Sequence, residues 1–393
     1  EDALVLLSRG YFSEFDLRFQ THKGWNQSLI YRKRIKTQML EEKDLDYDLA
    51  QARIFFRRPN HPLRLDVKIK LEETLTENRA TVYDSVGIGL GTYRYDPQFE
   101  EYVSDPNGAY IAYTILTGSH EPTTQFEGIQ RLEYDFGKRL NSKFKDIKYR
   151  LDWLWDFNGQ NFSVNRYGED DLNASTIIRS RSKLRHEWDY VNRTGRQIRT
   201  WWLGEKDLNN LDSRGADLRM NTELAVDWLE PINANTHAVV KLNQHDSNVE
   251  SGFSHNRDRS AQGTWAEIGI KKRFSSLWQT EVLMQNGYDI GRHQMSNYSA
   301  SLRGIRLDIL HFFSSKGRLQ GRFEWATVGL GGEAVYLPPE AVRGHALGET
   351  RKVNVQGHIL LRQNFSINVT INYISDIRYD NFINITGEIR AYF

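Results

Sequence analysis

Hydrophobic residues recur at every second position over long stretches of this chain. A helix would mix the two sets of alternate positions because its period is 3.6, whereas a strand points successive side chains to opposite faces. The pattern is seen in residues 65–72, 147–157, 217–228, 318–325, 353–361 and 365–373. In 217–228 the apolar face carries Leu218, Leu224 and Trp228, and the other face carries Asp217, Glu223 and Asp227. The sequence therefore predicts an all-β protein of long amphipathic strands.

Turn-forming residues divide these stretches into a regular succession. Residues 230–235 and 275–276 indicate short connections, and residues 243–262 and 288–297 indicate long ones. Their alternation predicts an antiparallel meander of about 16 strands, within a range of roughly 14–18, with both ends of the chain on one side. Helical patterning is confined to Met39–Asp48, for which a polar loop is the alternative.

The length of the strands distinguishes two architectures. Sandwich strands have about 5–6 residues, whereas a tilted strand that crosses a bilayer needs ~9–11. The stretches 147–157 and 217–228 have the second length, and Trp155 and Trp228 lie near their ends, where aromatic girdles meet the membrane surface. A closed sheet also satisfies every backbone group inside lipid. Residues 1–393 are therefore predicted to form a single transmembrane β-barrel domain.

The last residues of the chain carry a more specific pattern. Ile383, Ile385, Gly387, Ile389, Ala391 and Phe393 alternate with Asn384, Thr386, Glu388, Arg390 and Tyr392. This resembles the terminal strand of bacterial outer-membrane β-barrels, which alternates, ends in Phe and is recognised by the barrel-assembly machinery. The resemblance implies a location in the bacterial outer membrane, contact with its lipid and lipopolysaccharide, and an assembly signal at Ile389, Ala391 and Phe393. Ala391 departs from the family pattern, in which a larger apolar residue is common.

Residues 82–124 interrupt the succession of strands. Within them, residues 86–111 resemble a Gly- and Tyr-rich segment of very large outer-membrane proteins such as the type 9 secretion translocon, which would make this chain the barrel portion of a longer protein. Gly87, Gly89 and Gly91 are not followed by a helical pattern, so a phosphate-binding loop is not expected. A connection this long predicts a plug, a constriction loop or a docking segment.

Composition excludes several classes of function. The chain has 52 basic and 51 acidic side chains, so no net charge attracts nucleic acid. It has no cysteine, which excludes disulfides and thiol nucleophiles. Its 11 histidines form neither a His-x-x-x-His nor a His-Glu-x-x-His motif, the two spacings typical of zinc sites. Near Glu100 and Glu101, Asp105-Pro-Asn-Gly lacks the closing ligands of a calcium loop, so a β-turn is favoured. No metal and no cofactor are expected.

His186 is the one residue with a catalytic interpretation. It lies in an apolar row with Leu184 and Trp188, where an outer-membrane lipid hydrolase could place its base. No serine can be assigned to it by spacing, so a place in the aromatic girdle is favoured. The chain is therefore not expected to be an enzyme.

The charged faces of the strands predict the lining of a pore. Opposed charges in a lumen create a transverse electric field that selects between ions. Cross-strand ion pairs that only stabilise the wall are the alternative explanation of the same residues. The predicted lining consists of Lys148, Arg150, Asp152, Asp217, Arg219, Glu223, Asp227, Arg318, Arg322 and Glu324. The expected function is a channel or export conduit for polar solutes or polymer, with 82–124 as a plug. The alternative is a closed barrel that binds periplasmic or outer-membrane partner proteins.

Overall fold

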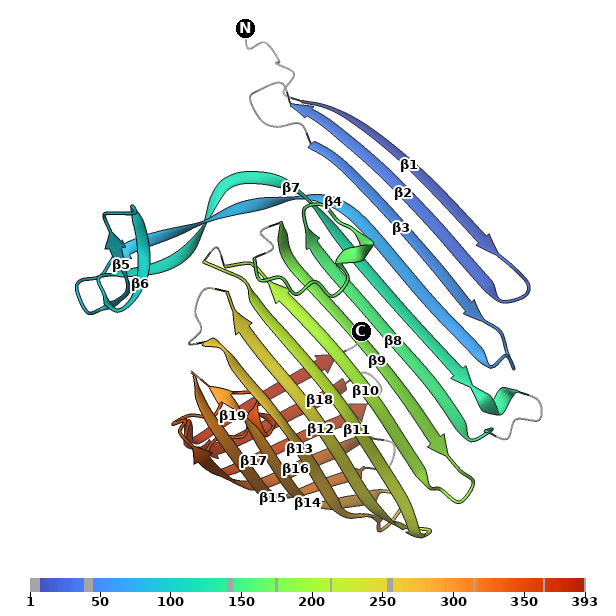
Figure 1. Ribbon diagram of the computed structural model, residues 1–393. Helices are drawn as coiled ribbons and strands as arrows, with labels where there is room; N and C mark the ends of the chain where they lie inside the picture. The colour runs from blue at the N-terminus through green and yellow to red at the C-terminus, as the bar shows by residue number, and fades with distance from the viewer. Residues whose placement is uncertain are drawn as a thin grey trace.

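The computed structural model describes residues 8–38, 45–139, 144–173, 176–212, 214–252, 257–293, 295–313, 316–362 and 365–391. They form one antiparallel sheet of 19 strands (Figure 1). The strands are β1 (Ser8–Gln20), β2 (Trp25–Gln38), β3 (Leu45–Arg57), β4 (Leu63–Ser85), β5 (Gly91–Asp96), β6 (Glu101–Gly108), β7 (Tyr110–Asp135), β8 (Ile147–Gly159), β9 (Ile177–Val191), β10 (Gln197–Asn209), β11 (Asp217–Asn233), β12 (Thr236–Ser251), β13 (Arg259–Arg273), β14 (Trp278–His293), β15 (Ser296–Phe312), β16 (Gly317–Gly332), β17 (Gly348–Arg362), β18 (Phe365–Asp376) and β19 (Tyr379–Ala391). The expected all-β meander is confirmed.

Each strand pairs with the next along the chain, except where β4 pairs directly with β7 and leaves β5 and β6 at the tip of a long hairpin. Without those two, 17 of the 19 strands make up the meander. The predicted 16 strands are therefore wrong. Because 17 is odd, β1 and β19 run in the same direction, and the prediction that both chain ends lie on one side is wrong for the described residues. Among these residues, β1 pairs only with β2 and β19 only with β18.

Several strands extend beyond their predicted limits. Most of 243–262 lies in β12 and β13, and most of 288–297 lies in β14 and β15, so neither range is a long connection. These strand ends carry polar residues on both faces, which hides the period of two. The helix considered for Met39–Asp48 is also wrong where it can be judged, because residues 45–48 belong to β3.

The register gives the sheet one apolar and one charged face. On β11, Val226 lies opposite Thr200 of β10 and Leu242 of β12, whereas Asp227 lies opposite Arg199 and Lys241. Antiparallel pairing puts directly opposite residues on the same face, so the alternation of each strand continues across the sheet. We call the charged face the inner face, because a loop folds onto it as described below.

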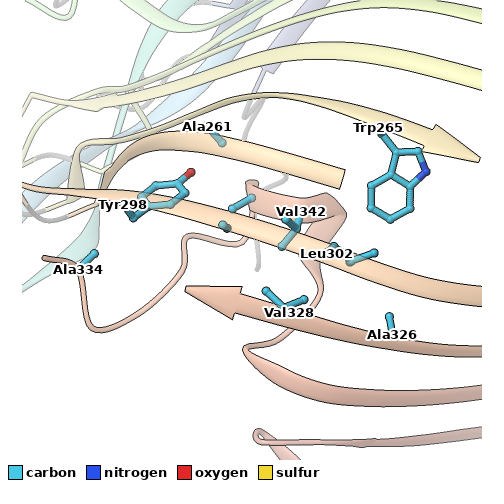
Figure 2. Close-up of a cluster of buried hydrophobic side chains, with 10 residues drawn as sticks. Ala261, Trp265, Tyr298, Leu302, Ala326, Val328, Ala334 and Val342 are labelled. Atoms are coloured by element: carbon cyan, nitrogen blue, oxygen red, sulfur yellow. The ribbon is translucent and has the colours of Figure 1, made fainter. Parts of the chain in front are cut away.

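Two buried clusters cover part of the sheet. One comprises Phe126, Trp155, Phe157, Ile177, Leu208, Ala216 and Leu218, with Phe162 and Leu172 of the β8–β9 connection packed against it. The other lies on the inner face and includes Trp265, Tyr298, Leu302 and Val328 together with Ala341 and Val342 (Figure 2). No helix in the described part of the chain is long and apolar enough to span a membrane.

Candidate functional site

Strands β10 to β13, strand β15 and the β16–β17 connection line a hollow of about 690 Å³ on the inner face. Trp201 of β10, Glu223 of β11, Lys241 of β12 and Arg306 of β15 are among the residues that line it. Side chains of five strands face the same space because the sheet is curved and the register keeps its charged positions in one row. The hollow is therefore bounded mainly by polar and charged groups.

An ion-pair network lies in the wall beside this hollow. The Arg306 Nη1 donates to Glu267 Oε1 at 2.8 Å, and the Lys241 Nζ lies 3.0 Å from Glu281 Oε1 and 3.8 Å from Glu267 Oε2. Gln285 Nε2 also donates to Glu267 at 3.1 Å. Glu267 is only 2% exposed, so its charge must be neutralised by these partners.

Residues 333–347, between β16 and β17, fold onto the inner face; we call them the inward loop. Its short 3-10 helix η4 (Ala341–Gly344) contacts β13, β14 and β15, and Figure 2 shows Val342 among the buried side chains of the wall. Ala341 and Val342 are both fully buried. The wall residues beneath are small, namely Ala261, Ala300 and Ala326, which leaves room for the loop to approach the strands.

Polar contacts fasten the inward loop at three points. Arg259 of β13 holds Glu340 through both carboxylate oxygens, with the Nε donating to Oε2 at 2.9 Å and the Nη2 donating to Oε1 at 2.9 Å. The Val342 backbone N–H donates to Asp289 Oδ2 at 2.6 Å, and His345 Nε2 lies 3.1 Å from Glu324 Oε1. Charge-assisted contacts of this kind are about twice as strong as neutral ones.

The backbone of the loop is held in an uncommon conformation. Val342 has φ 40° and Arg343 has φ 54°, in the left-handed region that residues with a Cβ rarely adopt. Each such residue costs roughly 1–3 kcal/mol, and for a β-branched side chain the conformation is a clear outlier. The anchors at Glu340 and His345 on either side of the pair offset this cost.

The register places all ten residues of the predicted lining on the inner face. Several belong to cross-strand pairs: Arg150 with Glu187 at 3.0 Å, Lys148 with Asp135 at 3.9 Å, Asp152 with Arg131 at 2.7 Å, and Arg322 with Asp308 at 2.6 Å. Asp217 pairs at 3.0 Å with Arg257 of the β12–β13 connection. Arg219 and Arg318 are exposed. The hollow brings together only Glu223 and Asp227 of the ten, and Glu324 contacts the inward loop.

The residues that organise the site are not among those predicted from the sequence. Glu267, Glu281 and Arg306 occupy inner positions of strands whose alternation is weak. Glu267 and Arg306 each lie between two apolar neighbours, which for Glu267 are Ala266 and Ile268. A charged residue flanked by apolar neighbours was the sequence signal that could have placed these side chains on the inner face. The inward loop had no such signal, because its contacts join residues far apart in sequence.

The segment 82–124 does not form an irregular insertion. Residues up to Ser85 continue β4, and those from Tyr110 continue β7, so the segment is a hairpin that carries β5 and β6. Figure 1 shows this extension projecting from the body of the sheet. We call residues 86–109 the extension tip.

The base of the extension is tied to the connection between β10 and β11. The Arg79 Nη1 donates to the Leu211 carbonyl at 2.6 Å, and the Thr114 hydroxyl donates to Asp212 Oδ1 at 3.2 Å. Arg214 pairs with Asp212 at 2.5 Å and donates to the Ala112 carbonyl. The hydrogen bond from Arg214 is the main cause that lowers the pKa of Asp212 below its ordinary value.

The remaining candidate residues have simpler surroundings. His186 lies on the apolar face, where its Nδ1 is 2.7 Å from the Tyr149 hydroxyl and its ring is 5.7 Å from that of Trp202. This placement fits an aromatic girdle. Ile389 and Ala391 lie in β19, and Phe393 lies outside the described residues. Among the described residues no group of three or more His, Asp or Glu side chains is arranged to hold a metal.

Comparison with solved structures identifies the fold. The alcaligin outer membrane receptor FauA from Bordetella pertussis is 7% identical and covers 97% of this chain with a TM-score of 0.50. The chain has the fold of an outer-membrane β-barrel. It spans 64% of the length of that receptor. This likeness supports the outer-membrane location expected from the terminal strand.

Other solved structures are similar at lower scores. The FrpB iron transporter from Neisseria meningitidis is 8% identical over 84% of this chain and 59% of its own, with a TM-score of 0.42. The ferric yersiniabactin uptake receptor FyuA from Yersinia pestis is 10% identical over 98% of this chain and 71% of its own, with a TM-score of 0.38. No family model and no curated protein matches the sequence. The likeness of 86–111 to a type 9 translocon segment gains no support from these comparisons.

Proposed function

We propose that the protein forms an uptake channel for polar solutes in the bacterial outer membrane, with the inward loop setting the width of the lumen. The observation that carries this is the inner face itself, where charged side chains continue from β8 to β16 and a loop is fastened onto them by specific polar contacts. A wall that served only stability would not need a buried loop on its polar side.

The likeness to a receptor supports uptake as the direction of transport. The receptor that this chain resembles is named for alcaligin, a solute that it receives from outside the cell. Export of polymer, the other expectation, has no such support. In outer-membrane barrels the short turns face the periplasm and the longer loops face outward. By that rule, the inward loop and the extension belong to the external side, where a solute arrives.

Ion selectivity tests the lining. Arg219 and Arg318 are exposed on the inner face, so replacing both with Glu should change selectivity without breaking a buried pair. Arg193→Glu, in the short turn between β9 and β10, changes the same charge away from the lining and serves as control. Reversal potentials in planar bilayers should shift toward cations for the lining variant only. An unshifted reversal potential in a conducting double variant would refute the assignment of these residues to the lining.

A second candidate function is partner binding by the extension. The Tyr83 and Tyr102 rings stack at 3.9 Å and pack with those of Tyr93 and Tyr110, which stiffens the structure. At the tip, Ile88 is 91% exposed and Leu90 is 75% exposed, although apolar side chains of this size gain by burial. Replacing 86–109 with a two-residue turn should abolish capture of a partner and leave conductance unchanged. Increased conductance would instead indicate that the tip obstructs the lumen.

A further inference from the structure

Arg343 of the inward loop lies over the ring of Trp265 on the inner face. The guanidinium carbon is 4.7 Å from the centre of the ring, which is the geometry of a cation–π contact. Arg343 forms no ion pair with any residue in the described ranges, in contrast to Arg259 and Arg306 nearby. Its charge is therefore directed to the ring and to the hollow that it lines.

The wall is shaped to present this ring to the lumen. A Cβ at Gly287 would lie 2.7 Å from the Trp265 ring, so the indole can lie against the strand only because position 287 has no side chain. On the loop side, the ring meets Arg343 and stacks with His345 at 5.9 Å. Departure of the inward loop would thus uncover an aromatic face that is now 97% buried, since Trp265 is 3% exposed.

Most carboxylates at the hollow already have a cationic partner. Glu205 pairs with Arg181, Glu267 with Arg306 and Glu340 with Arg259. The cations of the lining are Lys241, Arg306 and Arg343. Lys241 and Arg306 are both committed to Glu267 and Glu281. Neither would be available to an anionic solute.

One carboxylate of the lining, that of Glu223, has only neutral donors as partners. Glu223 accepts hydrogen bonds from Asn243 and from the Trp201 indole, which are neutral donors. Asp227 forms no close ion pair with a described residue, but Arg199 and Lys241 lie opposite it on the neighbouring strands. Arg343 lines the same hollow. Glu223 and Asp227 lie four residues apart on the inner face of β11, about 13 Å along the strand, so they suit the two ends of an extended dication.

We propose that Trp265, Glu223 and Asp227 form a binding site for organic cations that carry a guanidinium or ammonium group, and that Arg343 fills this site from within the chain. A cationic solute and the inward loop then compete for the same place, so binding of the solute displaces the loop. The inference deepens the proposed channel by naming a class of solute. It requires only that water reach the hollow, and it does not depend on conduction.

Calorimetric titration of the full chain in detergent with agmatine, which carries a guanidinium and an ammonium group, tests the site. Removing the Arg343 side chain should strengthen the binding of agmatine, because the apparent affinity rises with the fraction of protein molecules in which the site is open. We expect Arg343→Ala to bind agmatine about tenfold more tightly than the parent protein, the range a cation–π contact supports. Arg343→Lys keeps a cation at the site and should stay near the parent affinity.

Two further titrations make the result specific. Adding Glu223→Gln and Asp227→Asn to Arg343→Ala should abolish the gain, with an unchanged circular dichroism spectrum as the check on folding. Citrate, an anion, should gain nothing from any variant. Equal agmatine affinity in the parent and Arg343→Ala, or an equal gain for citrate, would overturn the proposal. Tight agmatine binding without conductance in bilayers would refute the channel and leave the site intact.

Discussion

Arg259 and Glu340 are 81 residues apart in sequence, yet their guanidinium and carboxylate groups form a two-point contact that fastens the inward loop to β13. Both side chains are largely shielded from water, with 17% and 21% of their surfaces exposed. A two-point contact of this kind fixes the relative orientation of the two side chains as well as the distance between them. The position of the loop over the wall therefore depends on it.

Breaking this contact should release the loop. Because the chain has no cysteine, an Ala341→Cys substitution gives a single thiol at a fully buried position of the loop. The thiol should react slowly with maleimide in the parent background and at least tenfold faster after Arg259→Gln, since opening the loop exposes it. Reaction rates in detergent micelles, followed by mass spectrometry, give the comparison.

Val335→Cys is the matched control for that experiment. Val335 belongs to the same loop but is 71% exposed, so its thiol should react quickly in both backgrounds. If Arg259→Gln left the position 341 thiol as protected as before, the pair would not be what holds the loop.

The network around Glu267 should dominate the stability of the wall. Glu267→Ala leaves the Arg306 and Lys241 cations with fewer partners, and removing one member of a buried pair costs about 3–5 kcal/mol. Asp16→Ala removes an equally direct partner from the exposed Arg18, where solvent screens the pair and the loss of stability should be far smaller. Urea unfolding in micelles measures both, and similar losses from the two substitutions would contradict the network's role.

The faces of the strands were predictable from the sequence, because the period of two survives wherever lipid and water face opposite sides. Residues 217–228 show this directly, and their register in β11 keeps the two sets apart. The strand number was not predictable to the same degree. Polar residues on both faces conceal where β12 to β15 end, and β4 and β7 continue together into what the sequence suggests is an insertion.

Gly287 should tolerate no side chain. A Cβ there would lie 2.7 Å from the Trp265 ring, so Gly287→Ala must displace the indole, at a cost of about 1–3 kcal/mol for overpacking. Gly387→Ala, in β19, is the control because no atom lies within 4 Å of its Cβ position. Equal thermal stability of the two variants would show that the ring adapts freely.

The base of the extension should loosen in acid. The folded-state pKa of Asp212 lies below its ordinary value because of Arg214, so the ionised carboxylate stabilises the contact above about pH 4. This contribution is lost as the pH falls through the lowered pKa. Hydrogen exchange of residues 110–116 should therefore rise below that pH in the parent protein. Asp212→Asn should exchange quickly at pH 7 already, and identical pH profiles for the two proteins would count against the contact.

The candidate site was less predictable than the faces. The alternation alone predicts that Glu223 and Asp227 lie on the charged face. The roles of Trp265 and Arg343 depend on where the inward loop folds. That position arises from contacts between residues such as Arg259 and Glu340, which no local pattern relates. The small wall residues beneath the loop belong to different strands, and only the register shows that they lie next to one another.

Single-channel conductance tests the central claim most directly. The full chain and its Arg259→Gln, Glu340→Gln double variant, which removes both charges of the contact together, are compared in planar bilayers. We expect small steps from the parent protein and clearly larger steps from the variant, because the loop no longer narrows the lumen. Identical steps from both proteins, or silence from both with intact β-sheet circular dichroism, would contradict a channel that the inward loop constricts.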